Sequence, residues 1–428
     1  MRGGSFKISI LLPNFVIRIL DKFLEKLGNY LQLNIKYYIK NAFYLTFANM
    51  VSAIFGLLLS VSFARFLPKE VYGQYSYVMS IFGVLAFFTL PGVNTAIIQA
   101  VARGYGRVFV EGIKIRFRWS ILGSIVMLAI GVYYFLDNSE EIGKCLIASS
   151  LFFPAYYVTD TVYAYLVGRK EFDKVARYQV LVQVVSVSLT IFIIYFSKDL
   201  LVIILTYMLI SSVIKLNFLL KFKDVESKKF DKSSISFGRH LTLMNIFSNL
   251  QTYFDRLVIG IFLGFADLAS YTIALGFSEQ VKSLSSVVST LIFPRLSEMD
   301  ETTAIFELKR RLPKYMFIFG IISGVLITLS PHIILFLFSE KYNDSVLYSQ
   351  LLLFSIFVAQ PALILNKAYF PSQRKIMELY VIRVSQPIVE ILSICIFVYI
   401  FGVFGVVISK LLSRIYITIL SIYFFYIK

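Results

Sequence analysis

Charged residues occur inside segments of this chain that are otherwise apolar, and the chemistry of these side chains is the first indication of its function. Carboxylates can hold a proton or a cation, whereas ammonium and guanidinium groups can hold phosphate oxygens. A charge at mid-bilayer costs about 2.5–3.5 kcal/mol on insertion scales, so such side chains face a protein interior or a wet cavity. The set comprises Asp160, Lys215, Asp255, Arg256, Glu279, Lys282, Lys367, Arg383, Glu390, Lys410 and Arg414.

Asp255 and Arg256 are adjacent, roughly midway along one apolar segment. One interpretation is a cavity cation beside an acid that binds a proton or an ion. The other is a structural ion pair with Glu279 or Lys282 of the next segment. Glu279 and Lys282 are three residues apart, so they share a helix face and can also pair with each other.

Other charges in the set differ in how deeply they lie. Asp160 is surrounded by Tyr and Thr residues, which fits a polar cavity wall or a cation site. Lys410 and Arg414 are four residues apart on one helix face, where they can bind phosphate or extend to the cytoplasm. Glu390 follows Pro387 and is a candidate protonated acid.

Two further charges, Lys215 and Arg383, are expected near the cytoplasmic ends of their segments. Long basic side chains at such positions extend to the interface, and we predict this for both.

The elements that position these charges are twelve long apolar segments. Each is about 18–25 residues long, which is enough to cross a hydrocarbon core of ~30 Å as a helix. The expected spans are 41–64, 76–98, 119–136, 145–168, 178–197, 200–220, 240–264, 267–293, 315–338, 347–370, 379–400 and 403–427. Prolines within them are expected to kink their helices.

Basic residues alternate between the gaps that separate these segments. The even-numbered gaps hold clusters of Lys and Arg at 103–118, 169–177, 221–239, 295–314 and 374–375, whereas the odd gaps hold few. Because Lys and Arg favour the cytoplasmic side, the even gaps and both termini are predicted to be cytoplasmic. The chain is thus expected to be a multi-pass protein of the cell membrane, either plasma or inner membrane.

Composition excludes several other classes of function. The chain carries a net charge of +17 with 58% hydrophobic residues, but the charge lies in short loops, so no nucleic-acid partner is needed to explain it. The two cysteines and two histidines show no metal-ligand spacing. There is no Walker motif, nucleophile elbow or HExxH motif. We therefore expect no enzyme activity, no cofactor and no metal.

Six spans return the chain to the cytoplasm, which favours a duplication. Residues 46–75 match residues 242–271 at several positions without a gap, and Pro154 with Asp160 is echoed by Pro361 with Lys367. Parallel repeats of this kind are typical of transporters that rock one bundle against another. The predicted organisation is a tail at 1–40 with an amphipathic helix, six-helix bundles at 41–220 and 240–428, and a cytoplasmic linker at 221–239.

Three stretches carry a resemblance to a known family. They are ARFLPKEVYGQYSYVMSIFG (64–83), YLVGRKEFDKVARYQVL (165–181) and YFDRLVIGIFLGFADLASYTIALGFSEQV (253–281). The chain resembles the oligosaccharide or polysaccharide flippases, including O-antigen flippases, of the multidrug/oligosaccharidyl-lipid/polysaccharide exporter superfamily. The resemblance implies an all-α, V-shaped fold of about twelve transmembrane helices in two pseudo-symmetric bundles.

The resemblance also implies transport of a polyprenyl-diphosphate-linked oligosaccharide to the outer leaflet by alternating access, for the synthesis of surface polysaccharide such as lipopolysaccharide. Implied partners are this lipid, membrane lipids, and the polymerase and glycosyltransferases of the pathway. The candidate cations for the diphosphate are Arg256, Lys282, Lys367, Lys410 and Arg414. The candidates for ion or proton coupling are Asp160, Asp255, Glu279 and Glu390.

Two observations bear on the choice between related substrates. The lipid II flippases of the superfamily carry basic residues in the first span, whereas this span is uncharged before Arg65, which argues against lipid II. The alternative function is a multidrug exporter of the same superfamily, which would need a net-acidic cavity for cationic drugs.

The topology predicts that cysteines introduced into the gap at 221–239 react with a membrane-impermeant thiol reagent only from the cytoplasmic side. Labelling of intact cells and of inverted vesicles measures this. Labelling from outside would contradict both the orientation and the division into halves.

Overall fold

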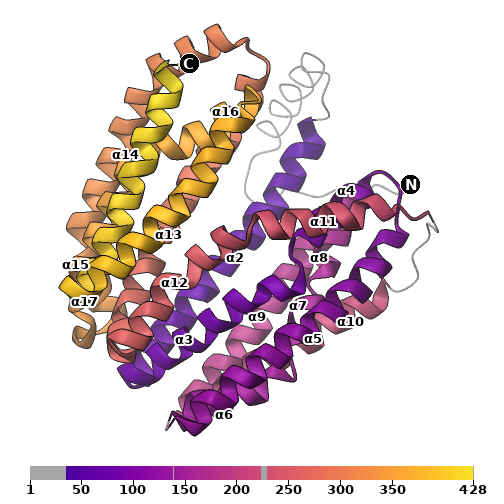
Figure 1. Cartoon of the computed structure of the whole chain (residues 1–428), viewed down its shortest axis with the longest axis vertical. Coiled ribbons are helices and arrows are strands. Elements are labelled where there is room, and N and C mark those ends of the chain that lie inside the picture. The colour runs from indigo at the N-terminus through magenta and orange to yellow at the C-terminus, as the bar shows by residue number, and fades with distance from the viewer. Residues whose placement is uncertain (1–34, 138, 223–228, 428) are drawn as a thin grey trace, which may run out of the picture.

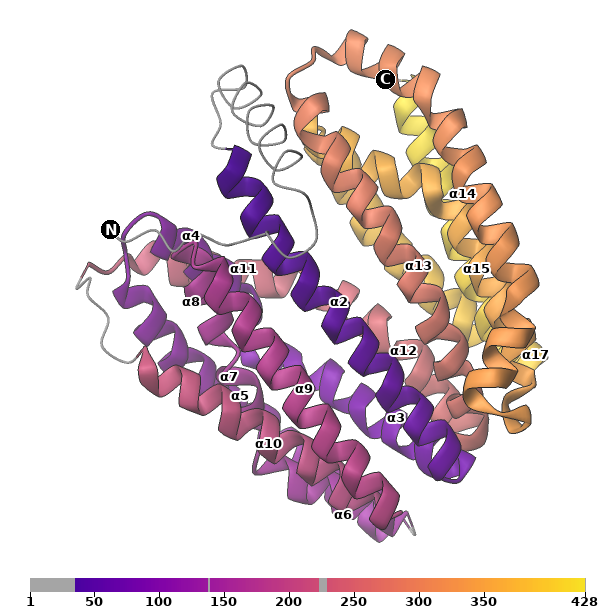
Figure 2. The same cartoon turned by 180° about the vertical axis from the view of Figure 1, so that it is seen from behind.

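The computed structural model describes residues 35–137, 139–222 and 229–427, and every element within these residues is helical (Figure 1). The amphipathic helix expected within 1–40 lies outside the described residues. The helices form two bundles that meet at one end and diverge at the other, as both views show (Figures 1 and 2).

The first bundle is built from the helices that precede the basic segment at 221–239. It contains α2 (Ile35–Phe66), α3 (Lys69–Leu85), α4 (Gly92–Ala102), α5 (Arg107–Leu136), α6 (Glu140–Ser150), α7 (Phe153–Val158), α8 (Thr161–Gly168), α9 (Phe172–Phe196) and α10 (Leu200–Lys221). We call it the N-terminal bundle.

The second bundle, the C-terminal bundle, contains α12 (Ile246–Phe262), α13 (Phe265–Ser297), α14 (Glu301–Phe338), α15 (Asp344–Ile364), α16 (Phe370–Ser372) and α17 (Ile376–Ile427). Helix α17 is 52 residues long, but Gly402 has φ 57° and ψ −136°, which divides it into two arms. The arms correspond to the two predicted spans 379–400 and 403–427.

Among the described residues, eight helices are long and apolar enough to cross a membrane, and the bent pair formed by α6 with α7 and α8 makes a ninth. Helix α17 is one of the eight helices, although its two arms correspond to two predicted spans. Helices α12 and α13 correspond to two further predicted spans. The observed fold is therefore consistent with about twelve spans.

Several predicted spans are broken rather than continuous, and prolines lie beside the breaks. The span at 76–98 is interrupted where Leu90 takes a left-handed conformation before Pro91. The span at 145–168 bends by 59°, with Pro154 at the start of α7. In the matching helix of the other bundle, Pro361 precedes a π-helical turn, Leu365–Tyr369. Proline causes such breaks because it removes a backbone donor.

Helix α11 (Lys232–Met244) connects the bundles by packing along α4. The backbones of α4 and α11 approach each other closely, because a Cβ atom at Gly92 would lie 2.4 Å from the carbonyl oxygen of Gly238. The Thr242 hydroxyl accepts a hydrogen bond from the Gly92 amide at 3.0 Å. The end of the predicted linker thus lies against the N-terminal bundle. The domain boundaries at 220 and 240 stay a prediction.

At the end where the bundles meet, they share an apolar core and a set of polar contacts. Buried Phe63 and Leu67 of the first bundle pack with Phe338 and Tyr342 from the second. Lys69 forms a 3.2 Å ion pair with Asp344. This junction, formed by α2 and α3 against α13 and the segment 336–344, is called the closed end below.

Two more polar contacts cross the closed end. The Lys341 ammonium donates to the Leu67 carbonyl at 2.9 Å. The Arg65 guanidinium donates to the carbonyls of Phe336 and Leu337 at the end of α14. These bonds satisfy carbonyls that the helix ends leave without partners.

Gly73 is predicted to be essential for the closed end. A Cβ atom there would lie 1.7 Å from the carbonyl oxygen of Phe265, so Gly73→Leu should push α3 away from α13. A cysteine pair, Lys69→Cys with Asp344→Cys, measures the separation of the two bundles at the closed end by cross-linking with a short bifunctional thiol reagent. The cross-link should form in the otherwise native chain and fall to background when Gly73→Leu is added.

The matched control is Gly56→Leu, because a Cβ atom at Gly56 meets nothing within 4 Å. Equal cross-linking in the two leucine variants, both inserted at native levels, would refute the steric role of Gly73.

Candidate functional site

A pocket of about 380 Å³ lies inside the C-terminal bundle, between α12, α13, α15 and α17. Basic side chains outnumber acidic ones on its walls. The charged residues that line it are Arg256, Glu279, Lys282, Glu390, Lys410 and Arg414. The structure thus brings together four of the five predicted diphosphate cations, and we call this cavity the basic pocket.

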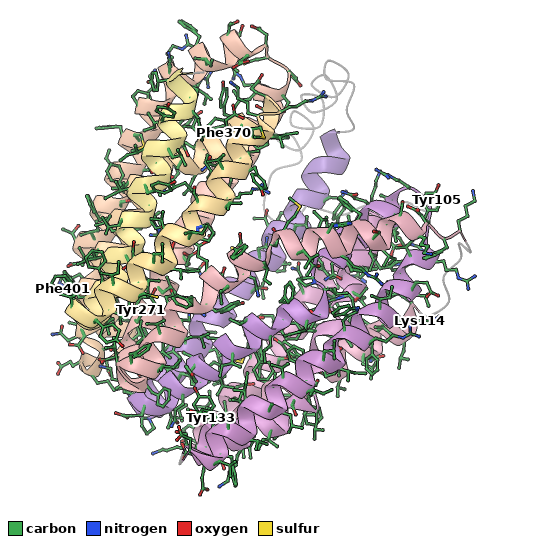
Figure 3. All side chains as sticks on the ribbon, in the orientation of Figure 1. Tyr105, Lys114, Tyr133, Tyr271, Phe370 and Phe401 are labelled. Atoms are coloured by element: carbon green, nitrogen blue, oxygen red, sulfur yellow. The ribbon has the colours of Figure 1, made fainter. Side chains whose placement is uncertain are left out.

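The basic pocket is organised by one buried lysine. The Lys410 ammonium lies 2.9 Å from Asp255 on α12 and 3.0 Å from Glu390, which is on the other arm of α17. Asp255 is fully buried and also accepts a hydrogen bond from the Tyr271 hydroxyl of α13. Figure 3 shows Tyr271 in the C-terminal bundle, toward the end where the two bundles meet. Lys410 therefore joins three segments by bridging two acids.

Glu390 accepts further hydrogen bonds on its second oxygen. The Gln251 amide donates at 2.6 Å and the Ser413 hydroxyl at 2.9 Å. Every one of these partners donates to the carboxyl group, as an ionised carboxylate requires. The acid that we expected near Pro387 is thus held as the counter-charge of Lys410.

Arg414 lies one helical turn beyond Lys410 and is also buried. Its guanidinium donates to the Ser355 hydroxyl at 2.5 Å and to the Leu352 carbonyl at 3.1 Å, both on α15. It also lies 3.6 Å from Glu279. Neither Lys410 nor Arg414 extends to the cytoplasmic surface, so that alternative is wrong for both.

Glu279 lies between two cations. Its carboxylate is 2.9 Å from Lys282, as the three-residue spacing predicts. About 40% of each of these two side chains is exposed, so this ion pair can exchange partners with a ligand. Asp255, by contrast, forms its ion pair with Lys410 on α17.

Arg256 differs from the other cations of the basic pocket. Its buried Nε has no hydrogen-bond partner among the described residues. The guanidinium lies 5.9 Å from the centre of the Tyr253 ring, which itself packs against Gly83 of α3. A buried donor without a partner is costly unless a ligand completes it. Arg256 is therefore the cation best prepared to accept an anion.

The remaining predicted site residues lie elsewhere. Lys367 is exposed on the π-helical turn after α15 and is not part of the wall of the basic pocket. Asp160 lies in the N-terminal bundle, at the break between α7 and α8. Both residues thus occupy interrupted helices, at the positions that the internal repeat equates.

Sequence reasoning missed two cations in the N-terminal bundle. Lys215 does not extend to the interface but is 7% exposed and lies 2.7 Å from Asp160. Arg116, which we assigned to a loop, is buried and donates to the Thr89 carbonyl, Asn94 and Thr161 at 2.8, 2.8 and 2.5 Å. Ser211 and Ser212, one turn before Lys215, were the available sign of a polar interior.

No group of three or more His, Cys, Asp and Glu side chains within the described ranges has the arrangement of a metal site. The chemistry available in the basic pocket is therefore that of cations held beside carboxylates, which can exchange one anionic partner for another.

Comparison with known proteins shows one family that this chain matches. A family model described as "Polysaccharide biosynthesis protein" matches residues 38–300. No curated protein sequence matches the chain.

Solved structures with a similar fold are transport proteins. The lipid II flippase MurJ in an inward closed conformation has a TM-score of 0.69 at 15% identity, covering 88% of this chain and 86% of that one. An inward-facing multidrug resistance MATE family transporter of the MOP superfamily has 0.63 at 13%, covering 90% and 97%. The Vibrio cholerae MATE transporter VcmN has 0.62 at 15%, covering 91% and 95%. These similarities establish the fold.

Lys410→Met is predicted to destabilise the protein strongly. The substitution leaves two buried carboxylates without their shared cation, and breaking a buried pair in this way costs about 3–5 kcal/mol. Thermal unfolding of the detergent-solubilised protein should show a large fall in melting temperature.

Adding Asp255→Asn and Glu390→Gln to Lys410→Met should restore much of the lost melting temperature, because the two added substitutions remove both unpaired carboxylate charges. Lys198→Met serves as the control, since Lys198 is exposed in the loop before α10. If Lys410→Met melts like the native protein, Lys410 does not stabilise the bundle.

Proposed function

Because the chain belongs to the polysaccharide biosynthesis protein family, we propose that it is a flippase for a polyprenyl-diphosphate-linked oligosaccharide. It moves this lipid from the cytoplasmic to the outer leaflet of the cell membrane for surface polysaccharide synthesis. The observation that carries the proposal is the basic pocket, in which the buried Nε of Arg256 has no partner within the part of the chain that the structure describes.

The charge of the basic pocket selects the class of substrate. Four cations and two carboxylates line the basic pocket, so its walls carry a net positive charge. Asp255 does not line the pocket and forms an ion pair with Lys410. A diphosphate gains charge-assisted hydrogen bonds there, because Arg and Lys groups are strong phosphate donors. A cationic drug would instead meet the guanidinium of Arg256, whose Nε has no hydrogen-bond partner among the described residues. This balance favours the flippase over the multidrug exporter.

The direction of transport follows from the distribution of basic residues. The basic segments at 103–107, 229–239, 295–311 and 374–375 lie toward the end where the bundles diverge (Figure 1). Under the positive-inside rule this end is cytoplasmic, and both chain termini are cytoplasmic as well. The conformation is then inward-facing, and the substrate enters from the cytoplasmic leaflet.

Export requires the closed end to separate. The contacts that must break are the Lys69–Asp344 ion pair and the hydrogen bonds of Arg65 and Lys341 to carbonyls across the junction. Partly exposed pairs of this kind contribute only about 0–1 kcal/mol each, so a few of them can hold the end closed without locking it. Rocking of the two bundles about this end gives alternating access.

Loss of the gene tests the proposal most directly. Lipid-linked oligosaccharide should accumulate in the cytoplasmic leaflet while surface glycan is lost. Unchanged lipid-linked oligosaccharide together with increased sensitivity to cationic drugs would favour the multidrug exporter instead.

Arg256→Ala, expressed in the deletion strain, should fail to restore surface glycan although the protein is inserted at native levels. The variant removes the guanidinium that completes the diphosphate site. Immunoblotting of membranes and quantification of surface glycan measure the two properties separately.

The matched control is Arg383→Ala, which removes an exposed guanidinium from α17 and should restore export. Normal export by Arg256→Ala would remove Arg256 from the mechanism.

A further inference from the structure

A second polar pocket lies in the N-terminal bundle and is not used by the diphosphate site. Its volume is about 380 Å³, and its walls come from α2, α4, α7, α8, α9 and α10, together with the break between α7 and α8. We propose that this pocket is a binding site for a neutral sugar residue of the transported glycan. The proposal rests on the proposed flippase function and deepens it.

The charge of this pocket is balanced internally. Asp160 and Lys215 are the two charged side chains of its wall, and they lie 2.7 Å apart. Lys215 is further held over the face of the Tyr156 ring at 4.3 Å. The acid and the base of the wall neutralise each other, and the buried Arg116 guanidinium behind the wall already donates to acceptors of the protein, so the described residues of the wall present no free charged group to an ionic ligand. The ligand of this pocket is therefore expected to be uncharged.

The hydrogen-bonding groups of the wall fit a ligand rich in hydroxyl groups. The Oε1 atom of Gln179 is buried and has no hydrogen-bond partner among the described residues. Gln183 lies one turn further along α9 and lines the same pocket. The Asp160 carboxylate is 39% exposed despite its ion pair, so it can accept additional hydrogen bonds. A buried acceptor without a donor is destabilising, and a sugar hydroxyl would supply the missing hydrogen bond.

Tyrosine rings supply the apolar part of the wall. Tyr156, Tyr163, Tyr178 and Tyr207 all line the pocket. Tyr156 and Tyr207 lie with their ring centres 6.3 Å apart, and the Tyr178 hydroxyl donates to Asp160 at 3.4 Å. A pyranose has apolar C–H faces and a polar rim, and aromatic side chains with polar tips match both. The pocket volume is at the small end of the usual range for ligand sites, about 300–1,000 Å³.

Arg116 fixes the wall of this pocket from behind. It connects Asn94 of α4 with Thr161 of α8 and with the Tyr157 carbonyl of α7 at 2.8, 2.5 and 3.1 Å. These bonds hold the broken helix around Asp160 in one arrangement. The site is thus organised before a ligand arrives, which lowers the cost of ordering on binding.

The two pockets divide one substrate between the two bundles. The anionic diphosphate lies with the basic pocket of the C-terminal bundle, and a sugar residue lies with the neutral pocket of the N-terminal bundle. A substrate held by both bundles can favour one arrangement of the bundles over the other, which a ligand bound to a single bundle cannot do through direct contacts alone.

Binding measurements with two probes test this assignment. The purified protein in lipid nanodiscs is titrated with undecaprenyl diphosphate, and with the lipid-linked oligosaccharide extracted from membranes of the deletion strain. The native protein should bind the glycosylated lipid more tightly. Gln179→Leu should lose about tenfold of that affinity, the loss expected for one hydrogen-bonded contact, and bind undecaprenyl diphosphate as before.

Two further variants separate the possible outcomes. Gln99→Leu replaces an exposed amide on α4 and should bind both probes like the native protein. Arg256→Ala should weaken binding of both probes, because each contains the diphosphate. A thermal unfolding curve for each variant confirms that it is folded.

Unchanged preference of Gln179→Leu for the glycosylated lipid would overturn the sugar site and leave the flippase intact. Failure of the native protein to bind either probe would overturn the proposed function and the sugar site together. If Gln179→Leu instead changes binding of tetraphenylphosphonium, with no change for the glycosylated lipid, the pocket recognises cations and the proposal is wrong.

Discussion

The clasp of Lys410 between Asp255 and Glu390 is the interaction on which the C-terminal bundle depends. Each of these charges is nearly excluded from solvent, so none is tolerable alone in a membrane protein. Together they tie α12 to both arms of α17, and Tyr271 adds α13. Beside this satisfied network lies Arg256, the neighbour of Asp255, whose buried Nε has no partner in the described ranges of the chain. Asp255 thus belongs to a structural ion pair, with Lys410 rather than with Glu279 or Lys282, and the adjacent Arg256 is the binding group that we propose.

The N-terminal bundle also neutralises a buried charge within the protein, but it does so with different side chains. There a single acid, Asp160, meets a single buried base, Lys215, and the polar surroundings are tyrosines and amides rather than further cations. The equivalent helix of the other bundle carries Lys367 on a π-helical turn. At the positions that the predicted internal repeat equates, both bundles therefore have an interrupted helix while the chemistry differs. The substrate that we propose has chemically different ends, and it would require this difference between the two bundles.

Sequence predicted the transmembrane class, the approximate spans and the Glu279–Lys282 pair, because each depends on local hydrophobicity or on spacing within one helix. The partner of Asp255 could not be predicted, since Lys410 is far along the chain and reaches it only through packing of α12 against α17. Arg116 and Lys215 were misplaced for a related reason. Both lie near the predicted ends of spans, where hydropathy cannot distinguish a side chain that extends to water from one that turns into the bundle.

The pairing of the acids bears on how transport is driven. Asp255 and Glu390 share Lys410, Glu279 has Lys282 and Arg414, and Asp160 has Lys215. Binding of a proton or a metal ion to any of them must first displace an ammonium or guanidinium group, which opposes coupling in this conformation. A diphosphate moving outward is already favoured by an inside-negative membrane potential, by about 2.3 kcal/mol per charge per 100 mV. The same cations that neutralise the acids attract that anion. The arrangement therefore favours export driven by the charge of the substrate itself, with the acids serving to hold the cations in place.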